Sequence, residues 1–420
     1  MRFFSGGPNL RTTNYANPVG ACGDEDPGLG FAAGPNLRTT TSLLDVPAWL
    51  ETVLRVVAFV VGAFVVLTTF LSAVKTVVVP RAVTLRITRT VFLVTRTLFE
   101  YLASEKRPFA ERDRILAVYA PLTLVLLPLV WVSLTIFGFA GIQWAIAGGS
   151  IRDACLVSGS SMLTLGVLFR RTVPAATFSY VQASIGLILV ALLISFLPTI
   201  YASFSRRETL VGLLESRAGL PPSPYEVLVR FNRIGALDSI DQDLFQQWEQ
   251  WFVEVEESHT SFASLVFFRS PHPERSWITA AGCVLDTGAI YLSVVDRPPS
   301  PRAALAIRSG FLSLLRIAEY FNLPVDRDPK PDDPISVTRR EFDLMLFELE
   351  AAGIPLKPNR DQAWLDFQGW RVNYDKALVS LAHMVIAPDG RWSSDRPGQP
   401  FTPSFRSAAR PNKRRRSRRS

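Results

Sequence analysis

The sequence is poor in the residues on which most catalytic and metal-binding sites depend. Among 420 residues there are three cysteines and three histidines, all far apart, so neither a disulfide framework nor a Cys/His metal site is expected. Gly-rich phosphate loops, the HExxH zinc motif and the GxSxG nucleophile motif are also missing from the sequence. We therefore expect no enzymatic activity, no metal and no cofactor.

Charge is the second deficit. Charged residues make up 20% of the chain, hydrophobic residues make up 48%, and the mean hydropathy is +0.20, which argues against a disordered chain and against an ordinary soluble protein. The net charge of +8 lies in one place, because Arg406–Ser420 holds eight basic residues and no acid. Residues 1–405 are therefore neutral, and the basic pI does not indicate a nucleic-acid-binding body.

Three long uncharged runs are present instead. A helix that crosses the hydrocarbon core of a membrane needs roughly 20 apolar residues, and each run reaches or exceeds that length: 56–74, 115–151 and 172–205. These runs predict transmembrane helices at about 54–78, 116–142 and 177–202.

The distribution of basic residues sets the expected orientation. Residues 80–114 carry eight Lys or Arg, and short loops rich in Lys and Arg stay on the cytoplasmic side. The first 48 residues carry only three arginines. We expect a multi-pass protein of the cell membrane with its N-terminus outside and its C-terminus in the cytoplasm.

Both ends of the chain are expected to be disordered. Residues 1–48 form the outer tail, in which GPNLRTT occurs at 7–13 and again at 34–40. Residues 388–420 form a polybasic tail, which favours anionic lipid when it lies at the cytoplasmic face. Nucleic-acid contact and a plain solvated tail are the alternatives, and no nucleic-acid partner is expected. The basic side chains assigned to lipid are Arg414, Arg415, Arg416, Arg418 and Arg419.

The basic linker at 80–114 contains an amphipathic segment, 86–103. Arg86, Arg89 and Arg96 share one helix face there, with Val91, Leu98 and Leu102 elsewhere. Such a helix lies along the inner membrane interface or serves as an ordinary connector, and the sequence favours neither.

The segment between the second and third spans, 148–174, is too short for two full crossings. It contains a helix-compatible piece, Ile151–Met162, followed by Leu163–Leu168 and then two arginines. Non-helical backbone at membrane depth is tolerated only where protein buries it or where it lines a water-filled cavity. The segment is therefore either a re-entrant pore loop, at about 149–172, or an outer loop folded onto the bundle.

The motif Ser158-Gly159-Ser160-Ser161 followed by Thr164-Leu165-Gly166 resembles the pore helix and filter of potassium channels. The resemblance covers about residues 115–205 and implies an outer helix, a re-entrant pore helix, a filter and an inner helix. In such a filter, stacked carbonyl oxygens from several subunits replace the hydration shell of a cation. The resemblance implies an ion path lined by Ser161, Thr164, Leu165, Gly166, Val167 and Leu168, in a homo-oligomer, most simply a tetramer.

The sequence departs from that filter pattern at several positions. Leu168 stands at the second filter glycine, Val167 replaces an aromatic residue, and Arg170 and Arg171 stand at the outer mouth. Positive charge at a mouth repels cations. The expectation is a cation channel for K⁺ or Na⁺ with the atypical filter TLGVL. The alternative is a non-conducting membrane scaffold whose C-terminal half binds a partner.

Two residues of the third span are candidates for the gate. Gly186 lies 20 residues after Gly166, where the family keeps a hinge, although glycine in membrane helices also permits close packing. Pro198 kinks the helix at the cytoplasmic mouth or marks its end.

Residues 206–387 are predicted to form a helical cytoplasmic domain. Its expected helices are Leu237–Glu257, Trp277–Val295, Arg302–Phe321, Thr338–Gly353 and Asp361–Val385. The second is apolar enough to approach a span, but Asp286 near its centre is costly in lipid, so we expect a buried core helix. The fold class expected for the whole chain is an all-α membrane protein with three spans, one re-entrant loop and this domain.

Overall fold

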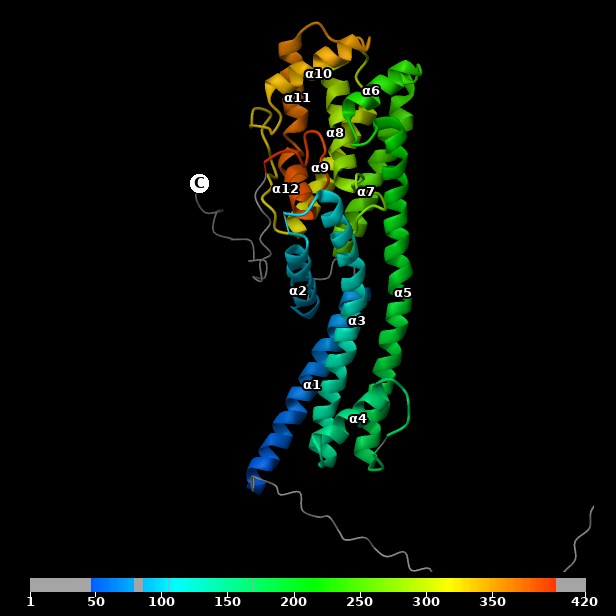
Figure 1. The fold of residues 1–420 in the computed structure, drawn as a ribbon, viewed down its shortest axis with the longest axis vertical. Coiled ribbons are helices and arrows are strands. Elements are labelled where there is room, and N and C mark those ends of the chain that lie inside the picture. Colours follow the sequence, from blue (N-terminus) through cyan, green and yellow to red (C-terminus); the bar gives the residue numbers. More distant parts are fainter. Residues whose placement is uncertain (1–46, 79–85, 105, 169, 398–420) are drawn as a thin grey trace, which may run out of the picture. The chain divides into compact units, whose positions relative to one another are not determined.

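The computed structural model describes residues 47–78, 86–104, 106–168 and 170–397 (Figure 1). Every regular element within those residues is helical, and the one β-bridge joins Val295 to Leu356. The long elements are α1 (Ala48–Val78), α2 (Arg86–Leu102), α3 (Phe109–Ala147), α4 (Ile151–Met162), α5 (Val173–Ala218), α6 (Pro224–Arg233), α7 (Gln246–Ser261), α8 (Trp277–Val294), α9 (Pro301–Tyr320), α10 (Arg339–Ala351), α11 (Arg360–Arg371) and α12 (Asp375–Val385). All contacts discussed below lie within residues 51–420, one of the two units into which the chain divides.

Four of these helices, α1, α3, α5 and α8, are long and apolar enough to cross a membrane. They differ in burial. In α8, 94% of the residues are buried inside the protein, against 22%, 39% and 22% in the most apolar stretches of α1, α3 and α5. A helix that is apolar all round and covered by protein belongs to a core, whereas exposed apolar helices need lipid or another partner. The three predicted spans lie within α1, α3 and α5, and α8 is the buried core helix expected around Asp286.

Glycines allow α1 and α3 to touch. A side chain at Gly62 would collide with the carbonyl oxygen of Gly138, and one at Gly141 would come within 3.1 Å of the carbonyl oxygen of Ala58. Small residues let helix backbones approach closely where lipid provides no hydrophobic drive. The approach therefore accounts for the glycines within these apolar helices.

The 46-residue helix α5 is continuous from Val173 to Ala218. It passes through Pro198, so this proline does not end the helix, and it crosses residues 205 and 206, where the sequence places the start of a separate domain. Its last turns pack against α6, α7 and α8. One rigid element therefore belongs both to the apolar bundle and to the C-terminal helical domain, residues 224–397.

The C-terminal helical domain is built around α8, which contacts α6, α9, α11 and α12. The predicted capping box is present at the start of α10. The Thr338 hydroxyl accepts a hydrogen bond from the backbone N–H of Glu341, and the Glu341 carboxylate accepts one from the backbone N–H of Thr338. The sequence predicts one helix over Asp361–Val385, but α11 ends at Arg371 and α12 begins at Asp375. At the break, the Asn373 side-chain amide donates to the carbonyl oxygens of Gly369 at 2.9 Å and Trp370 at 3.0 Å, which satisfies carbonyl groups at the end of α11.

The first ten residues of the segment predicted to be a disordered tail are folded. Residues 388–397 fold against the domain, where the Trp392 side chain is almost fully buried. The arginines assigned to lipid, and the GPNLRTT repeat, lie outside the described residues.

Candidate functional site: the loop between α3 and α5

The loop that joins α3 to α5 runs beside α5 as far as Gly186 and then returns to its starting point near Gly148. Ser150 caps the start of α4 by accepting the Asp153 N–H at 3.1 Å. The other end of α4 reaches Gly186, where a side chain would collide with the carbonyl oxygen of Met162. The return ends at Arg170, whose Nη1 donates to the carbonyl oxygen of Gly148 at 3.0 Å, beside the starting point. Gly186 is 13 residues into α5, so the loop penetrates about 20 Å along that helix.

Buried polar contacts hold α4 between its neighbours. The Gln182 side chain on α5 donates to the carbonyl oxygen of Ser158 at 2.9 Å and to its hydroxyl at 2.7 Å. The Ser158 hydroxyl donates in turn to the carbonyl oxygen of Ile136 on α3 at 2.7 Å. Both side chains are fully buried, and such bonds fix position because each buried group would otherwise be left unsatisfied. Gln182 therefore fastens α4 to α5 while Ser158 fastens it to α3.

Sequence reasoning did not identify Gln182 or Ser160. The signal for Gln182 was available, because it is the one amide side chain in the uncharged run 172–205. Ser160 supports the non-helical segment that follows α4, residues 163–168, here called the return strand. Its hydroxyl accepts a hydrogen bond from the Leu168 N–H at 3.1 Å. Nothing in the spacing of Ser160 predicts that contact.

The six residues assigned to the ion path lie together at the end of α4 and in the return strand. Thr164 and Gly166 both have left-handed backbone angles, with φ of +54° and +67°. Glycine adopts that conformation readily, whereas it is strained for threonine because the threonine side chain is branched at Cβ. Strain of this kind persists only where the surroundings impose it. Here the Thr164 and Leu165 N–H groups are bonded to the carbonyl oxygens of Ser161 and Ser160.

The return strand presents an apolar surface that is left exposed by the part of the chain that the structure describes. Val167 is 74% exposed, and the other members of this surface are Leu163, Leu165 and Leu168. Exposed apolar side chains grouped on one loop indicate a surface that another molecule covers.

Arginines surround the start of the loop. Arg170 is turned back onto Gly148, while Arg171 is exposed. The Arg55 guanidinium lies against Gly148 as well, since a Cβ built there would be 2.8 Å from its Nη2. Carbonyl groups at a helix C-terminus attract cations, so the end of α3 partly satisfies these charges. Of the two arginines assigned to the outer mouth, only Arg171 is left exposed.

The two gate candidates have different surroundings. Gly186 is buried against Met162, which assigns it a packing role at the deepest point of the loop. Pro198 lies between Phe196 and Ile200, which are buried against Leu124 of α3 and Leu265. Pro198 therefore sits where the C-terminal helical domain meets α5.

That meeting point is a short stretch after α7, residues 262–269, here called the junction segment. Its aromatic rings pack on α5: Phe262 lies 5.6 Å from Phe196, and Phe268 lies 5.5 Å from Phe204, between ring centroids. Arg207 near the inner end of α5 donates to the carbonyl oxygens of Leu265 at 2.8 Å and Phe268 at 2.7 Å. The junction segment is thus bonded directly to α5, which sequence patterns did not suggest.

His259 completes this contact from α7. Its Nε2 lies 3.2 Å from Nη1 of Arg207 and acts as the acceptor, because a guanidinium has only donors. Burial, and then the neighbouring charge of Arg207, holds the pKa of His259 well below its ordinary value of 6.5. The imidazole is therefore neutral, as the geometry requires.

A second set of contacts ties the end of α12 to α2 and α3. Arg269 forms an ion pair with Asp113 and donates to the carbonyl oxygens of Val385 at 2.9 Å and Ile386 at 2.8 Å. Arg96 on α2 donates to the carbonyl oxygen of Met384 at 2.9 Å. The domain is therefore attached to α2, α3 and α5 together.

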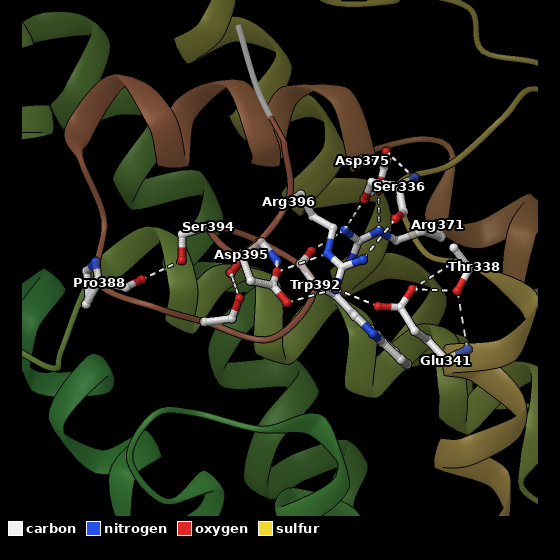
Figure 2. A network of polar contacts seen from close by, with 12 residues as sticks. Ser336, Thr338, Glu341, Arg371, Asp375, Pro388, Trp392, Ser394, Asp395 and Arg396 are labelled. Carbon is white, nitrogen blue, oxygen red and sulfur yellow. Dashed lines mark hydrogen bonds and ion pairs between the residues drawn. The ribbon is translucent and has the colours of Figure 1, made fainter. Parts of the chain in front are cut away.

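The most polar buried region lies inside the domain itself, around Arg371 (Figure 2). The Arg371 guanidinium is fully buried, pairs with Asp286, and bonds to Asp375 at 2.7 Å and to the carbonyl oxygen of Trp392. Burial alone lowers the pKa of Arg371, but Asp286 and Asp375 raise it by more, so its net shift is upward. The network joins α8, α11, α12 and the 388–397 segment.

A neighbouring ion pair fastens the last described residues. Arg396 lies 2.7 Å from Glu341 at the start of α10. Burial raises the pKa of Glu341, but the bonds from Arg396 and Thr338 outweigh it and lower the value to about 2. Both networks join distant segments through buried or half-buried ion pairs, although Asp286 Oδ2 is buried without a hydrogen-bond partner. We interpret them as structural anchors.

Within the described residues, no three His, Cys, Asp or Glu side chains come together as a metal site. Comparisons of the chain with protein families, with curated proteins and with solved structures gave no match.

Proposed function

We propose that the chain is the subunit of a membrane ion channel in which α1, α3 and α5 cross the bilayer and residues 149–172 form a re-entrant pore loop. The observation that carries the proposal is the path of the loop, which enters beside Gly148, reaches Gly186 and returns to Gly148. Irregular backbone at that depth is tolerated where protein buries it or where it lines a water-filled cavity, and the exposure of residues 163–168 favours the cavity. In this proposal the N-terminus lies outside and the C-terminal helical domain lies in the cytoplasm.

The exposed apolar surface of the return strand supports an assembly of several copies around one axis. A single loop cannot enclose a path, whereas a ring of four copies would place Leu165, Val167 and Leu168 around one axis and bring their carbonyl groups together. The C-terminal end of α4 carries partial negative charge toward the loop. This charge favours a cation, and the resemblance to potassium channels makes K⁺ or Na⁺ the proposed permeant ion.

The signal that opens the pore enters through the C-terminal helical domain in this proposal. The junction segment contacts α5 on both sides of Pro198, at Phe196 and at Phe204. Because α5 is one continuous helix, a displacement of the junction segment moves the inner end of the pore. The polybasic tail, beyond the described residues, binds anionic lipid at the same face.

Ion flux from liposomes tests the proposal. Purified protein is reconstituted, and flux is measured under separate K⁺, Na⁺ and Cl⁻ gradients for wild type, Gly166→Asp and Gly353→Asp. The two glycines are matched, because both have positive φ and neither has a neighbour within 4 Å of an added Cβ. Cation flux that Gly166→Asp abolishes and Gly353→Asp retains is the expected result.

The second candidate is a non-conducting scaffold, favoured by Leu168 in the filter and by the exposed charge of Arg171. Folded, oligomeric protein that passes no ion under any gradient supports the scaffold. Equal loss of flux in both glycine variants would remove the loop from the ion path.

A further inference from the structure

The exposed side chains that the structure describes in helix α2 are uncharged, and Arg89 is half-buried. Among its described side chains, the exposed ones are Thr90, Val94, Thr97, Leu98, Tyr101 and Leu102. These positions recur at helical spacing and so lie on one side of the helix. A connector that faces water exposes charged residues. In α2, by contrast, Arg96 is buried and bonded to Glu100 at 2.6 Å.

The opposite face of α2 is fixed against α3. The hydroxyl of Thr123 donates to that of Thr95 at 3.0 Å, and the hydroxyl of Tyr119 donates to the carbonyl oxygen of Phe92 at 3.2 Å. Val91, early in α2, clusters with Leu127 and Trp131 of α3, whereas Phe99, late in α2, clusters with Leu116 and Ala120, so the two helices run antiparallel. Beside this contact, α3 continues the exposed apolar surface at Val118, Leu122 and Val125.

The length of α3 gives the depth of this surface. Val118 and Gly148 are 30 residues apart, or about 45 Å along a helix, which equals the thickness of a bilayer with its headgroups, about 40–45 Å. With Gly148 at the outer boundary, α2 lies within the inner leaflet. Its most exposed side chain, Tyr101 at 82%, is of the type that gathers at membrane interfaces. Exposed Lys106, Arg107 and Arg114 follow directly.

We infer that α2 is embedded in the inner leaflet, with its exposed apolar face, 94, 98, 101 and 102, in contact with lipid and with Lys106, Arg107 and Arg114 at anionic headgroups. This inference rests on the proposed membrane placement of α1 and α3 and does not require conduction. It decides between the two roles that the sequence allows for the segment 86–103.

Spin-label accessibility in liposomes of phosphatidylcholine and phosphatidylserine tests it. A nitroxide is attached at Leu98→Cys in full-length protein whose native cysteines have been replaced, and its collisions with oxygen and with a water-soluble nickel chelate are compared. Two sites of nearly equal exposure serve as controls. Leu129→Cys on α3 stands for lipid and Leu344→Cys on α10 for water, against exposures of 54%, 56% and 54% for Leu98, Leu129 and Leu344.

The expected result is that Leu98 matches Leu129, with an oxygen-to-nickel ratio several-fold above that at Leu344. A ratio like that of Leu344 places α2 in water and overturns the inference. Low accessibility to both reagents means that protein, such as a second copy, covers this face, which also overturns it. If Leu129 itself is water-accessible, the membrane placement fails, whereas absent flux with lipid exposure at Leu98 removes only the channel.

Discussion

Two regions of the molecule differ in what they leave exposed: the C-terminal helical domain and the loop between α3 and α5. In the domain, the buried charge of Arg371 has its partners within the same chain: Asp286, Asp375 and the carbonyl oxygen of Trp392. In the loop, a few buried bonds hold α4, but the return strand leaves Leu165 and Val167 exposed. The comparison teaches that the domain satisfies most of its buried polar groups within one chain, whereas the loop leaves apolar side chains exposed, which the proposed channel would complete with other copies.

The largest effect is expected from breaking the domain's network. Arg371→Ala leaves Asp286 buried without its partner and should lower the free energy of unfolding by about 3–5 kcal/mol. Thermal unfolding in detergent, followed by circular dichroism, measures the loss. The control is Arg360→Ala, which removes an exposed ion pair with Glu350 and should cost at most about 1 kcal/mol. Equal stability of the two variants would contradict the claim that the buried ion pairs of Arg371 stabilise the domain.

The next effect concerns the deepest point of the loop. Gly186→Ala places a methyl group against the carbonyl oxygen of Met162 and should destabilise the bundle by about 1–3 kcal/mol, with altered flux. Gly159→Ala in α4 is the matched control, because an added Cβ there has no neighbour within 4 Å. A hinge role without packing would instead leave the stability of Gly186→Ala unchanged.

Removing the anchor of α4 should have a comparable or slightly smaller effect. Gln182→Leu leaves the buried Ser158 hydroxyl and carbonyl without that donor and should cost about 1–2 kcal/mol. Flux should fall along with the stability of the bundle. Ser184→Ala, two residues on, removes a hydroxyl that bonds only within its own helix at Tyr180 and should leave both quantities near wild type. Identical behaviour of the two variants would show that Gln182 does not position the loop.

The smallest effect is a pH dependence at the junction segment. The pKa of His259 is lowered in the folded state. Below pH 6.5, His259 therefore binds a proton in the unfolded chain but stays neutral in the folded chain. Stability from this residue is therefore full above pH 6.5 and falls as the pH drops, by at most about 1.4 kcal/mol per unit. Unfolding measured between pH 7.5 and 5 should show a weaker slope for His259→Gln than for wild type, and an unchanged slope would contradict a neutral buried His259.

Local patterns predicted much of the fold. The piece Ile151–Met162, the capping box at Thr338 and the buried role of the helix around Asp286 all depend on neighbours along the chain, and the structure has each of them. The channel interpretation of the loop stays a prediction.

Contacts between distant segments could not be read in the same way. Arg207 meets Leu265 and Phe268, and Gln182 meets Ser158, only after the helices pack. The same holds for Arg371, whose partner Asp286 lies 85 residues away, and for the break between α11 and α12, where the Asn373 amide bonds to the end of α11. Neither glycine nor proline marks this break, so periodicity alone predicted one helix.

The central claim is that ions pass the return strand, and labelling of Val167 tests it most directly. Val167→Cys in a cysteine-free background is reconstituted in liposomes and treated from outside with a positively charged, membrane-impermeant thiol reagent. Val60→Cys on α1, which is also exposed, is the comparison. The account predicts that Val167→Cys reacts and that its cation flux then falls, while Val60→Cys keeps its flux. Full modification of Val167→Cys with unchanged flux would contradict it.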